Sequence, residues 1–262
     1  MYVLDVAAPA GRDPSPVVDR LLARFEESGQ VAVVRRDTVL DAPDHTTVRV
    51  GDGGWRSTSG TDIDLDAALD TLAATHAYAI TIGFPDAALP RLAIGDVDVE
   101  DPLARVSGAD DVDVDAVADA LHETEPHESL SSLVAAAKRS PDAEFSGAIA
   151  TFTGRVRAKE DPEDARTEAL EFEKYDGVAE ERFEEITSDI EARDGVYEVL
   201  LHHRTGRIET GEDIVFVVVL AGHRREAFRA VEDGIDRLKD EVPLFKKEVT
   251  VDDTFWSHER DA

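Results

Sequence analysis

The chain has 262 residues, of which 58 are Asp or Glu and 28 are Lys or Arg, so its formal net charge is −30. Hydrophobic residues make up 42% of the chain, which is enough for a packed core and excludes a disordered polyanion, while the charge excludes a non-specific binder of nucleic acid or anionic membranes. The absence of cysteine excludes a thiol nucleophile, a disulfide framework and a Cys-ligated metal.

Alternating strand and helix patterns fill the first ninety-five residues. Apolar runs predict strands at Tyr2–Ala7, Val31–Val34 and Tyr78–Phe84. Apolar residues at helical spacing predict helices from Val18 to Phe25 and around Leu65–Ala74. This order is typical of a βαβ unit, so we expect an N-terminal α/β domain over residues 1–95.

The following segment is strongly acidic. Between Asp96 and Glu125 there are eleven acidic residues and one basic residue, Arg105. Such a composition is typical of a solvated connection between domains. We therefore predict an acidic linker over residues 96–126 that ends in a helix from Asp113 to His122.

The remainder, residues 127–262, predicts a second domain that mixes strands and helices. An amphipathic helix that includes Phe228 and Leu238 must end before Pro243, because Val242 is disfavoured in the helical conformation by the proline that follows it. Another helix face contains Val178, Phe183, Ile186 and Ile190. Strands are predicted at Gly147–Thr153, Leu170–Glu173, Val196–His203 and Asp213–Leu220.

The loop Ala8–Pro16 follows the first predicted strand, where a nucleotide-binding βαβ unit carries its phosphate-binding loop. It lacks the glycine followed by Lys and Ser/Thr that such a loop needs, so we expect no nucleotide hydrolysis. Ser15 and Pro16 are instead predicted as the N-cap and first residue of a helix. With the IGF and LPRL sequences between Ile82 and Leu92, the domain resembles a degenerate member of the molybdopterin-guanine dinucleotide biosynthesis adapter family.

Basic residues gather in three short segments of the second domain. From His223 to Lys247 there are seven Lys or Arg against six acids, although the whole chain has about one base for two acids. If these groups converge, they form a pocket for a phosphate-bearing small molecule. The groups are Arg155 and Arg157, His223 and Arg224, Lys239, and Lys246 with Lys247.

Each of these residues also has a structural interpretation. Arg157 is compatible with an ordinary surface arginine, and His223 with a core histidine at the end of a strand. Lys239 is well placed to complement the dipole at the end of a helix. Spacing alone therefore predicts an anion site without proving one.

Residues 146–256 resemble the catalytic large subunit of molybdopterin synthase. Five segments match the family in order: GAIATFTGRVR, LEFEKYDGVAEERF, HHRTGRIETGE, VFVVVLAGHRREAF and LKDEVPLFKKE. The resemblance implies an α+β hammerhead-type catalytic domain and a homodimer at the centre of a heterotetramer. It also implies the transfer of two sulfurs to cyclic pyranopterin monophosphate, which forms the dithiolene of molybdopterin.

The resemblance also assigns roles to residues of this chain. It implies that Lys239 and Lys246 are catalytic and that Phe152 forms the pocket wall. Phe245 stands where the family often has Trp, and Lys247 where it often has Arg, and neither change removes a charge. The implied substrate-binding residues are Arg155, Val156, Arg157, His223, Arg224, Lys239, Lys246, Lys247 and Glu248.

Because the chain has no cysteine, its sulfur must arrive on a partner. In the family this partner is a small ubiquitin-like carrier whose C-terminal Gly-Gly ends in a thiocarboxylate. We expect no cofactor and no metal. A carrier terminus beside several amines also presents an acyl carbon to nucleophiles, so we expect that Lys239, Lys246 or Lys247 can become conjugated to the carrier.

Two other functions remain as alternatives. The chain would be a non-catalytic adapter or nucleotide-binding scaffold in molybdenum cofactor assembly, or its N-terminal domain would be an active GTPase. The retained basic residues argue against the first, and the incomplete phosphate loop argues against the second.

The acids, scattered through every segment, predict a surface adapted to high salt or, alternatively, one that recruits basic partners. The start of the chain lacks a signal sequence, so we expect a cytoplasmic protein.

Overall fold

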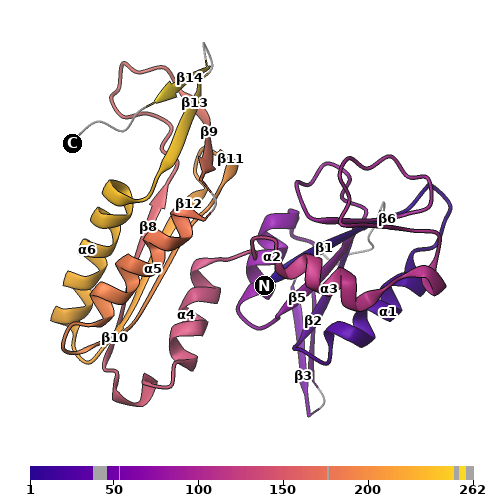
Figure 1. The fold of residues 1–262 in the computed structure, drawn as a ribbon, viewed down its shortest axis with the longest axis horizontal. Coiled ribbons are helices and arrows are strands. Elements are labelled where there is room, and N and C mark those ends of the chain that lie inside the picture. The colour runs from indigo at the N-terminus through magenta and orange to yellow at the C-terminus, as the bar shows by residue number, and fades with distance from the viewer. Residues whose placement is uncertain (38–45, 53, 176, 251–253, 258–262) are drawn as a thin grey trace. The chain divides into compact units, whose positions relative to one another are not determined.

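A computed structural model describes residues 1–37, 46–52, 54–175, 177–250 and 254–257 (Figure 1). The chain divides into two compact units, residues 1–128 and 129–262. Each has its own hydrophobic core. In the described part of the chain, no helix is long and apolar enough to cross a membrane.

The first unit is built on a parallel five-stranded sheet in the order β2-β5-β1-β6-β7. Two further strands, β3 and β4, form a separate antiparallel hairpin. The predicted strand at Tyr2–Ala7 is confirmed without change, and the helix predicted around residues 65–74 ends one residue earlier. The elements are β1 (Tyr2–Ala7), α1 (Ser15–Phe25), β2 (Val31–Arg35), β3 (Thr47–Gly51), β4 (Gly54–Thr58), α2 (Leu65–Ala73), β5 (Tyr78–Ile82), β6 (Arg91–Ile94), β7 (Ala104–Val106) and α3 (Val114–His122).

The segment 96–126 differs from the expected acidic linker. Its residues form β7, which pairs with β6, and α3, which begins after an Asp113 side-chain cap. Val106, Val117 and Leu121 are buried in the same core as β1 and α1. The acidic residues cover the outer side of elements whose apolar residues pack inward, so this segment belongs to the first unit. The helix expected from Asp113 to His122 is α3.

The loop between β1 and α1 is closed by the chain itself. The Arg12 guanidinium donates a hydrogen bond to the Ser107 carbonyl and lies against Gly95, where a Cβ atom would come within 2.9 Å of it. The helix also begins one residue earlier than predicted. Its N-cap is Pro14, while the Ser15 backbone N–H donates to the Asp13 carboxylate at 3.0 Å, so Ser15 is not the N-cap.

Among its described residues, the second unit has two antiparallel sheets and three α-helices. In Figure 1, α5 and α6 cover one face of the three-stranded sheet β10-β12-β8, and α4 covers the other. The second sheet has the order β11-β9-β13-β14. The elements are α4 (Leu130–Arg139), β8 (Ala148–Arg155), β9 (Thr167–Lys174), α5 (Val178–Glu191), β10 (Val196–His203), β11 (Gly206–Glu209), β12 (Asp213–Ala221), α6 (Arg224–Glu241), β13 (Leu244–Thr250) and β14 (Thr254–Ser257).

The sequence pattern explains this arrangement. β12 is buried along almost its entire length because helices pack on both of its faces, which is why it lacks polar alternation. The prediction that α6 ends before Pro243 is confirmed, since Val242 adopts an extended conformation. The four strands and two helices predicted here are all present, and the fold is mixed α/β as predicted.

Candidate active site

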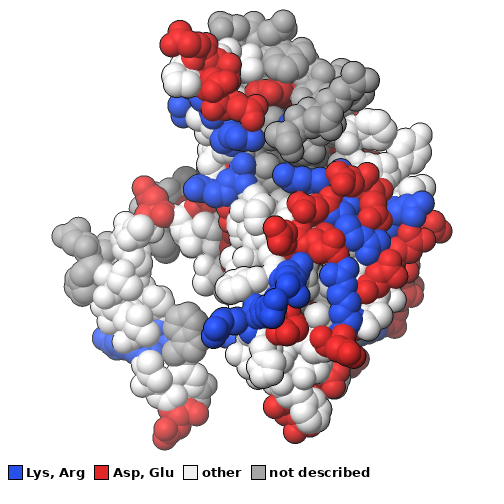
Figure 2. All heavy atoms as spheres, turned by 90° about the vertical axis from the view of Figure 1, so that its left-hand side faces the viewer, with Lys and Arg blue, Asp and Glu red and all other residues white. Residues whose placement is uncertain are grey.

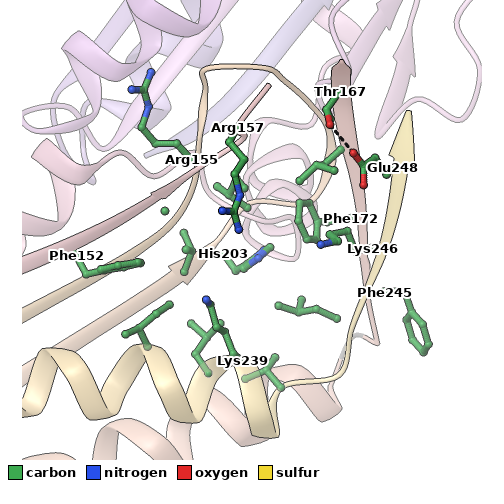
Figure 3. A pocket seen from close by; sticks show the side chains of 18 of the residues that line it. Phe152, Arg155, Arg157, Thr167, Phe172, His203, Lys239, Phe245, Lys246 and Glu248 are labelled. Atoms are coloured by element: carbon green, nitrogen blue, oxygen red, sulfur yellow. Dashed lines mark hydrogen bonds between the residues drawn. The ribbon is translucent and has the colours of Figure 1, made fainter. Parts of the chain in front are cut away.

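A cavity of about 400 Å³ lies in the second unit, between the end of α6 and the inner face of the second sheet. Strands β8, β10 and β12 contribute residues from the first sheet, and β9 and β13 from the second. Its walls combine apolar side chains, such as Phe152 and Leu238, with charged groups (Figure 3). The predicted pocket wall residue, Phe152, lines it.

Four of the predicted basic residues line this cavity: Arg155, Arg157, Lys239 and Lys246. They come from the end of β8 and the loop after it, from the last turn of α6, and from β13. In Figure 3 the Arg157 and Lys239 side chains point toward the middle of the cavity from opposite sides. The fold thus brings together residues up to ninety positions apart in the sequence.

The two arginines lie at the rim of the cavity. Arg157 is 72% exposed and its guanidinium lies 3.1 Å from the Glu160 carboxylate. Arg155 donates to the Gly211 carbonyl at 3.1 Å and lies 3.4 Å from the Asp213 carboxylate. Exposed ion pairs of this kind contribute little to stability, so an incoming anion can exchange with these partners at small cost.

Acidic groups also face the cavity. Glu248 on β13 accepts a hydrogen bond from the Thr167 hydroxyl on β9, which fixes the orientation of its carboxylate (Figure 3). Glu248 and Lys246 are two residues apart on one strand and therefore share a face of the sheet. Glu160 contributes a second carboxylate at the rim.

The structure places four predicted substrate-binding residues outside this cavity, and two of them, Val156 and Lys247, lie next to residues that line it. Val156 is 2% exposed and packs in the small core between the sheets, with Phe172 and Ile208. Lys247 lies on the opposite face of β13 from Lys246, where its ammonium donates to the Glu171 carboxylate at 2.8 Å. Alternation along a strand explains why neighbours in the sequence separate in this way.

His223 and Arg224 lie at the other end of α6 from Lys239. Arg224 is the first residue of the helix and Lys239 is fifteen residues further along, a separation of roughly 22 Å at the rise of an α-helix. Both residues of the His-Arg pair are exposed. They do not share a pocket with Lys239 in one chain, so the expected convergence of all these basic groups does not occur within a single chain.

His203 lines the cavity although the sequence analysis assigned it no role. It is 7% exposed, and its ring meets the Phe172 ring edge-on with centroids 4.7 Å apart. Its segment, HHRTGRIETGE, was part of the family resemblance. Alternation along the strand Val196–His203 was the one pattern in the sequence that indicated its position. It places His203, at the end of the strand, on the same face as Val199 and Leu201.

Charges of both signs cover the surface of the protein. Figure 2 shows Lys and Arg side chains interleaved with Asp and Glu side chains on one face. The cavity differs from this surface, because its four basic residues outnumber its two acidic ones. The fold and the site thus define an α/β protein with a basic, partly apolar cavity of a size that suits a small anionic molecule.

Comparison with known proteins identifies the family. Residues 123–241 match the family described as MoaE protein. The chain is 51% identical over 267 residues to the probable molybdopterin synthase of Haloferax volcanii. This alignment covers 99% of this chain and all of the Haloferax protein. The chain is 40% identical over 116 residues to the molybdopterin synthase catalytic subunit of Yersinia pestis, covering 44% of this chain and 76% of the relative. The chain therefore belongs to the molybdopterin synthase catalytic subunit family, an enzyme family of molybdenum cofactor biosynthesis, and the predicted resemblance is confirmed.

A solved structure is also similar to part of the chain. The structure of MobB from Bacillus subtilis is similar to 47% of this chain. The similarity spans the whole of the MobB chain, with 16% sequence identity and a TM-score of 0.38. A similarity of this size carries no conclusion about the function of the first unit.

Proposed function

We propose that the protein transfers sulfur from a thiocarboxylated ubiquitin-like carrier to cyclic pyranopterin monophosphate and so forms the molybdopterin dithiolene. The observation that supports this best is the cavity that Lys239 and Lys246 line together with two arginines. The chain has no cysteine to carry sulfur itself, so a carrier must supply it. Family membership supports the reaction class, and the lining of the cavity supports this site for it.

The charges in the cavity fit an anionic substrate. Arg155 and Arg157 at the rim offer guanidinium groups to a phosphate, to which arginine can bind in a bidentate manner. Lys239 and Lys246 also line the cavity, where they stabilise the negative charge that develops as the sulfur attacks. Glu248, oriented by Thr167, shares this face of β13 with Lys246.

We propose that the working enzyme is a homodimer whose two copies complete each pocket. His223 and Arg224 lie too far from Lys239 to act with it in one chain, so a second copy would have to supply them. Phe228, on the first turns of the same helix, is 65% exposed, and Arg225 and Arg229 flank it in the sequence. An exposed aromatic side chain among arginines is typical of a protein interface.

A mixing experiment tests this arrangement. Lys239→Ala and Arg224→Ala proteins are each expected to be inactive, because every pocket of either dimer lacks one group. Mixed dimers contain one pocket with both groups, so combining the two proteins after dissociation should recover part of the activity. Mixing Lys239→Ala with Lys246→Ala is the control, since both residues belong to the same chain's pocket and a mixed dimer gains no complete one. Failure of the first mixture to exceed this control would overturn the shared pocket.

The reaction itself is tested with purified components. The protein is mixed with thiocarboxylated carrier and cyclic pyranopterin monophosphate, and the dithiolene product is assayed. Lys239→Ala is expected to abolish turnover while costing about 0.3–1 kcal/mol of stability, since an exposed lysine at a helix end interacts mainly with the helix dipole. Lys138→Ala, at the end of α4, is the matched control. Near-normal product formation by Lys239→Ala would contradict the assignment of this pocket.

A further inference from the structure

His203 lies in the wall of the cavity, at the end of β10. Residues 199, 201 and 203 of this strand face α5 and α6, whereas His202 faces the other side, where its ring stacks on Phe216 with centroids 6.2 Å apart. His203 is therefore directed toward the space below the last turn of α6, which carries Lys239. In Figure 3 its ring lies between Lys239 and Phe172.

The contacts of His203 fix which of its ring nitrogens carries a proton. Nδ1 lies 2.8 Å from the backbone carbonyl of Arg204. Because a carbonyl oxygen can only accept a hydrogen bond, Nδ1 is the donor. In the neutral ring Nε2 then has no proton and is the basic atom, and the edge contact with Phe172 limits rotation of the ring.

The proposed reaction requires a group that accepts a proton. When the sulfur of a thiocarboxylate displaces an oxygen substituent of the substrate carbon, a C–S bond forms, the C–O bond breaks with its electron pair on oxygen, and the product is a thioester that joins carrier and substrate. Water must attack its acyl carbon, so that a C–O bond forms and the C–S bond breaks with its electron pair on sulfur. The products are the carrier carboxylate, a substrate thiolate and two protons, the first taken by the base and the second lost from the new carboxyl group.

The lysines and arginines of the cavity are less suited to this step. A lysine or arginine in its charged form stabilises an oxyanion but has no lone pair to accept a proton. Imidazole has an ordinary pKa of about 6.5 and is the side chain best matched to proton transfer near neutral pH. The charged groups that share the cavity with His203 are Arg155, Arg157 and Glu160 at and after β8, Lys239 on α6, and Lys246 and Glu248 on β13.

We propose that His203 is a catalytic residue whose Nε2 takes a proton from the water that hydrolyses the thioester between carrier and substrate. This inference rests on the proposed sulfur transfer and adds to it the residue that releases the carrier. It separates two tasks: the lysines stabilise charge during attack, and His203 moves the proton during release.

The test compares His203→Gln and His202→Gln in the full-length protein with thiocarboxylated carrier and cyclic pyranopterin monophosphate. Glutamine retains hydrogen bonding but does not titrate. We expect His203→Gln to lower the rate of dithiolene formation about 10²–10⁴-fold, the usual contribution of a general base. The carrier–substrate thioester should accumulate, seen as an increase in carrier mass that neutral hydroxylamine removes. His202→Gln, on the opposite face of the same strand, should behave as wild type.

Two further measurements separate catalysis from structural support. The wild-type rate should fall at acidic pH, because the protonated imidazole cannot act as a base, and this limb should be absent from His203→Gln. In His203→Ala, added imidazole should restore turnover, which it would not do if His203 only supported the fold.

Specific results would overturn the proposal. A His203→Gln rate within a few-fold of wild type with the same pH profile would do so, as would slow turnover without accumulated thioester and without imidazole rescue. These results leave the sulfur transfer intact, since the wild-type protein still makes product. Absence of product from the wild-type protein with both substrates would instead remove the proposed function, and the role of His203 with it.

Discussion

Lys246 and Lys247 are neighbours in the sequence, but their ammonium groups lie on opposite faces of β13. Lys246 lines the cavity, whereas Lys247 donates to the carboxylate of Glu171, its cross-strand partner on β9, at 2.8 Å. Arg207 on β11 stands on the other side of Glu171, at 3.7 Å. The outer face of the second sheet thus carries a row of charges, positive, negative and positive, which is separate from the chemistry of the cavity.

This separation predicts different effects for two otherwise similar substitutions. Lys246→Ala removes a positive charge from the cavity and should reduce dithiolene formation about 10²-fold or more, as expected for loss of a group that stabilises developing charge. Lys247→Ala should retain near-normal turnover, because it breaks an ion pair on the outer face of the sheet. Steady-state rates of the two variants check this. Equal loss of activity would show that Lys247 reaches the substrate as well.

The same row predicts a pH dependence of stability. The Lys247 ammonium, through its hydrogen bond, lowers the pKa of Glu171 below its ordinary value of 4.5. A carboxyl group with a lowered pKa in the folded state contributes stability above pH 4.5, and this contribution is lost as pH falls through the lower folded-state value.

Substitution of Glu171 tests this sign. The difference in free energy of unfolding between wild type and Glu171→Gln should be larger at pH 6 and should shrink toward pH 3. Denaturant titrations of both proteins across this range measure it, with Glu173→Gln on the same strand as the control. A difference that grows as the pH is lowered would contradict the role given to this ion pair.

Local patterns in the sequence predicted most of the secondary structure. Apolar runs and helical spacing identified β1, β10 and the end of α6 at Pro243, because each of these signals depends on neighbouring residues. Composition was misleading for residues 96–126, where acidic side chains on the outer surface concealed the buried Val106, Val117 and Leu121. Charge counts describe the outside of an element, whereas packing is decided by the spacing of its apolar residues.

The site was harder to predict for geometric reasons. Lys239 and Lys246 are identified from the sequence by the family resemblance, and the fold places both in one cavity. Arg224 was grouped with them because it is near in sequence, but an eighteen-residue helix places it at the opposite end. His203 was missed because its position in the cavity depends on the pairing of β10 with β12 and on the packing of α6, and neither is visible in its own segment.

Removal of residues 1–125 should leave sulfur transfer largely intact. We propose that residues 127–262 form the catalytic domain, and every residue of the cavity lies within the second compact unit. A protein that begins there retains Ser129, whose side chain caps α4 through a reciprocal hydrogen-bond pair with Ser132. Removal of twelve further residues, up to residue 137, should be disruptive, because Leu133 and Ala137 of α4 pack against β12. Activity assays of both truncated proteins check this, and a folded, carrier-binding but inactive 126–262 fragment would contradict it.

The cavity also predicts a side reaction with the carrier. A carrier terminus placed beside Lys239 and Lys246 presents its acyl carbon to two amines at high effective concentration. If the carrier arrives as an activated acyl species, attack by one lysine nitrogen expels the activating group and forms an isopeptide bond. The conjugate would fill the cavity, so conjugated protein should be less active than unmodified protein.

The structure sharpens which lysine should react. Lys247 was included with the other two on sequence grounds, but its ion pair with Glu171 holds it on the outer face of β13. Digestion of protein recovered from carrier-rich cells should therefore give peptides with a Gly-Gly remnant on Lys239 or Lys246, and little on Lys247. Lys138 and Lys159 are internal controls, since neither lines the cavity. A remnant confined to Lys138, Lys159 or Lys247, or no remnant at all, would show that entry of the carrier terminus into this cavity does not lead to acylation of its lysines.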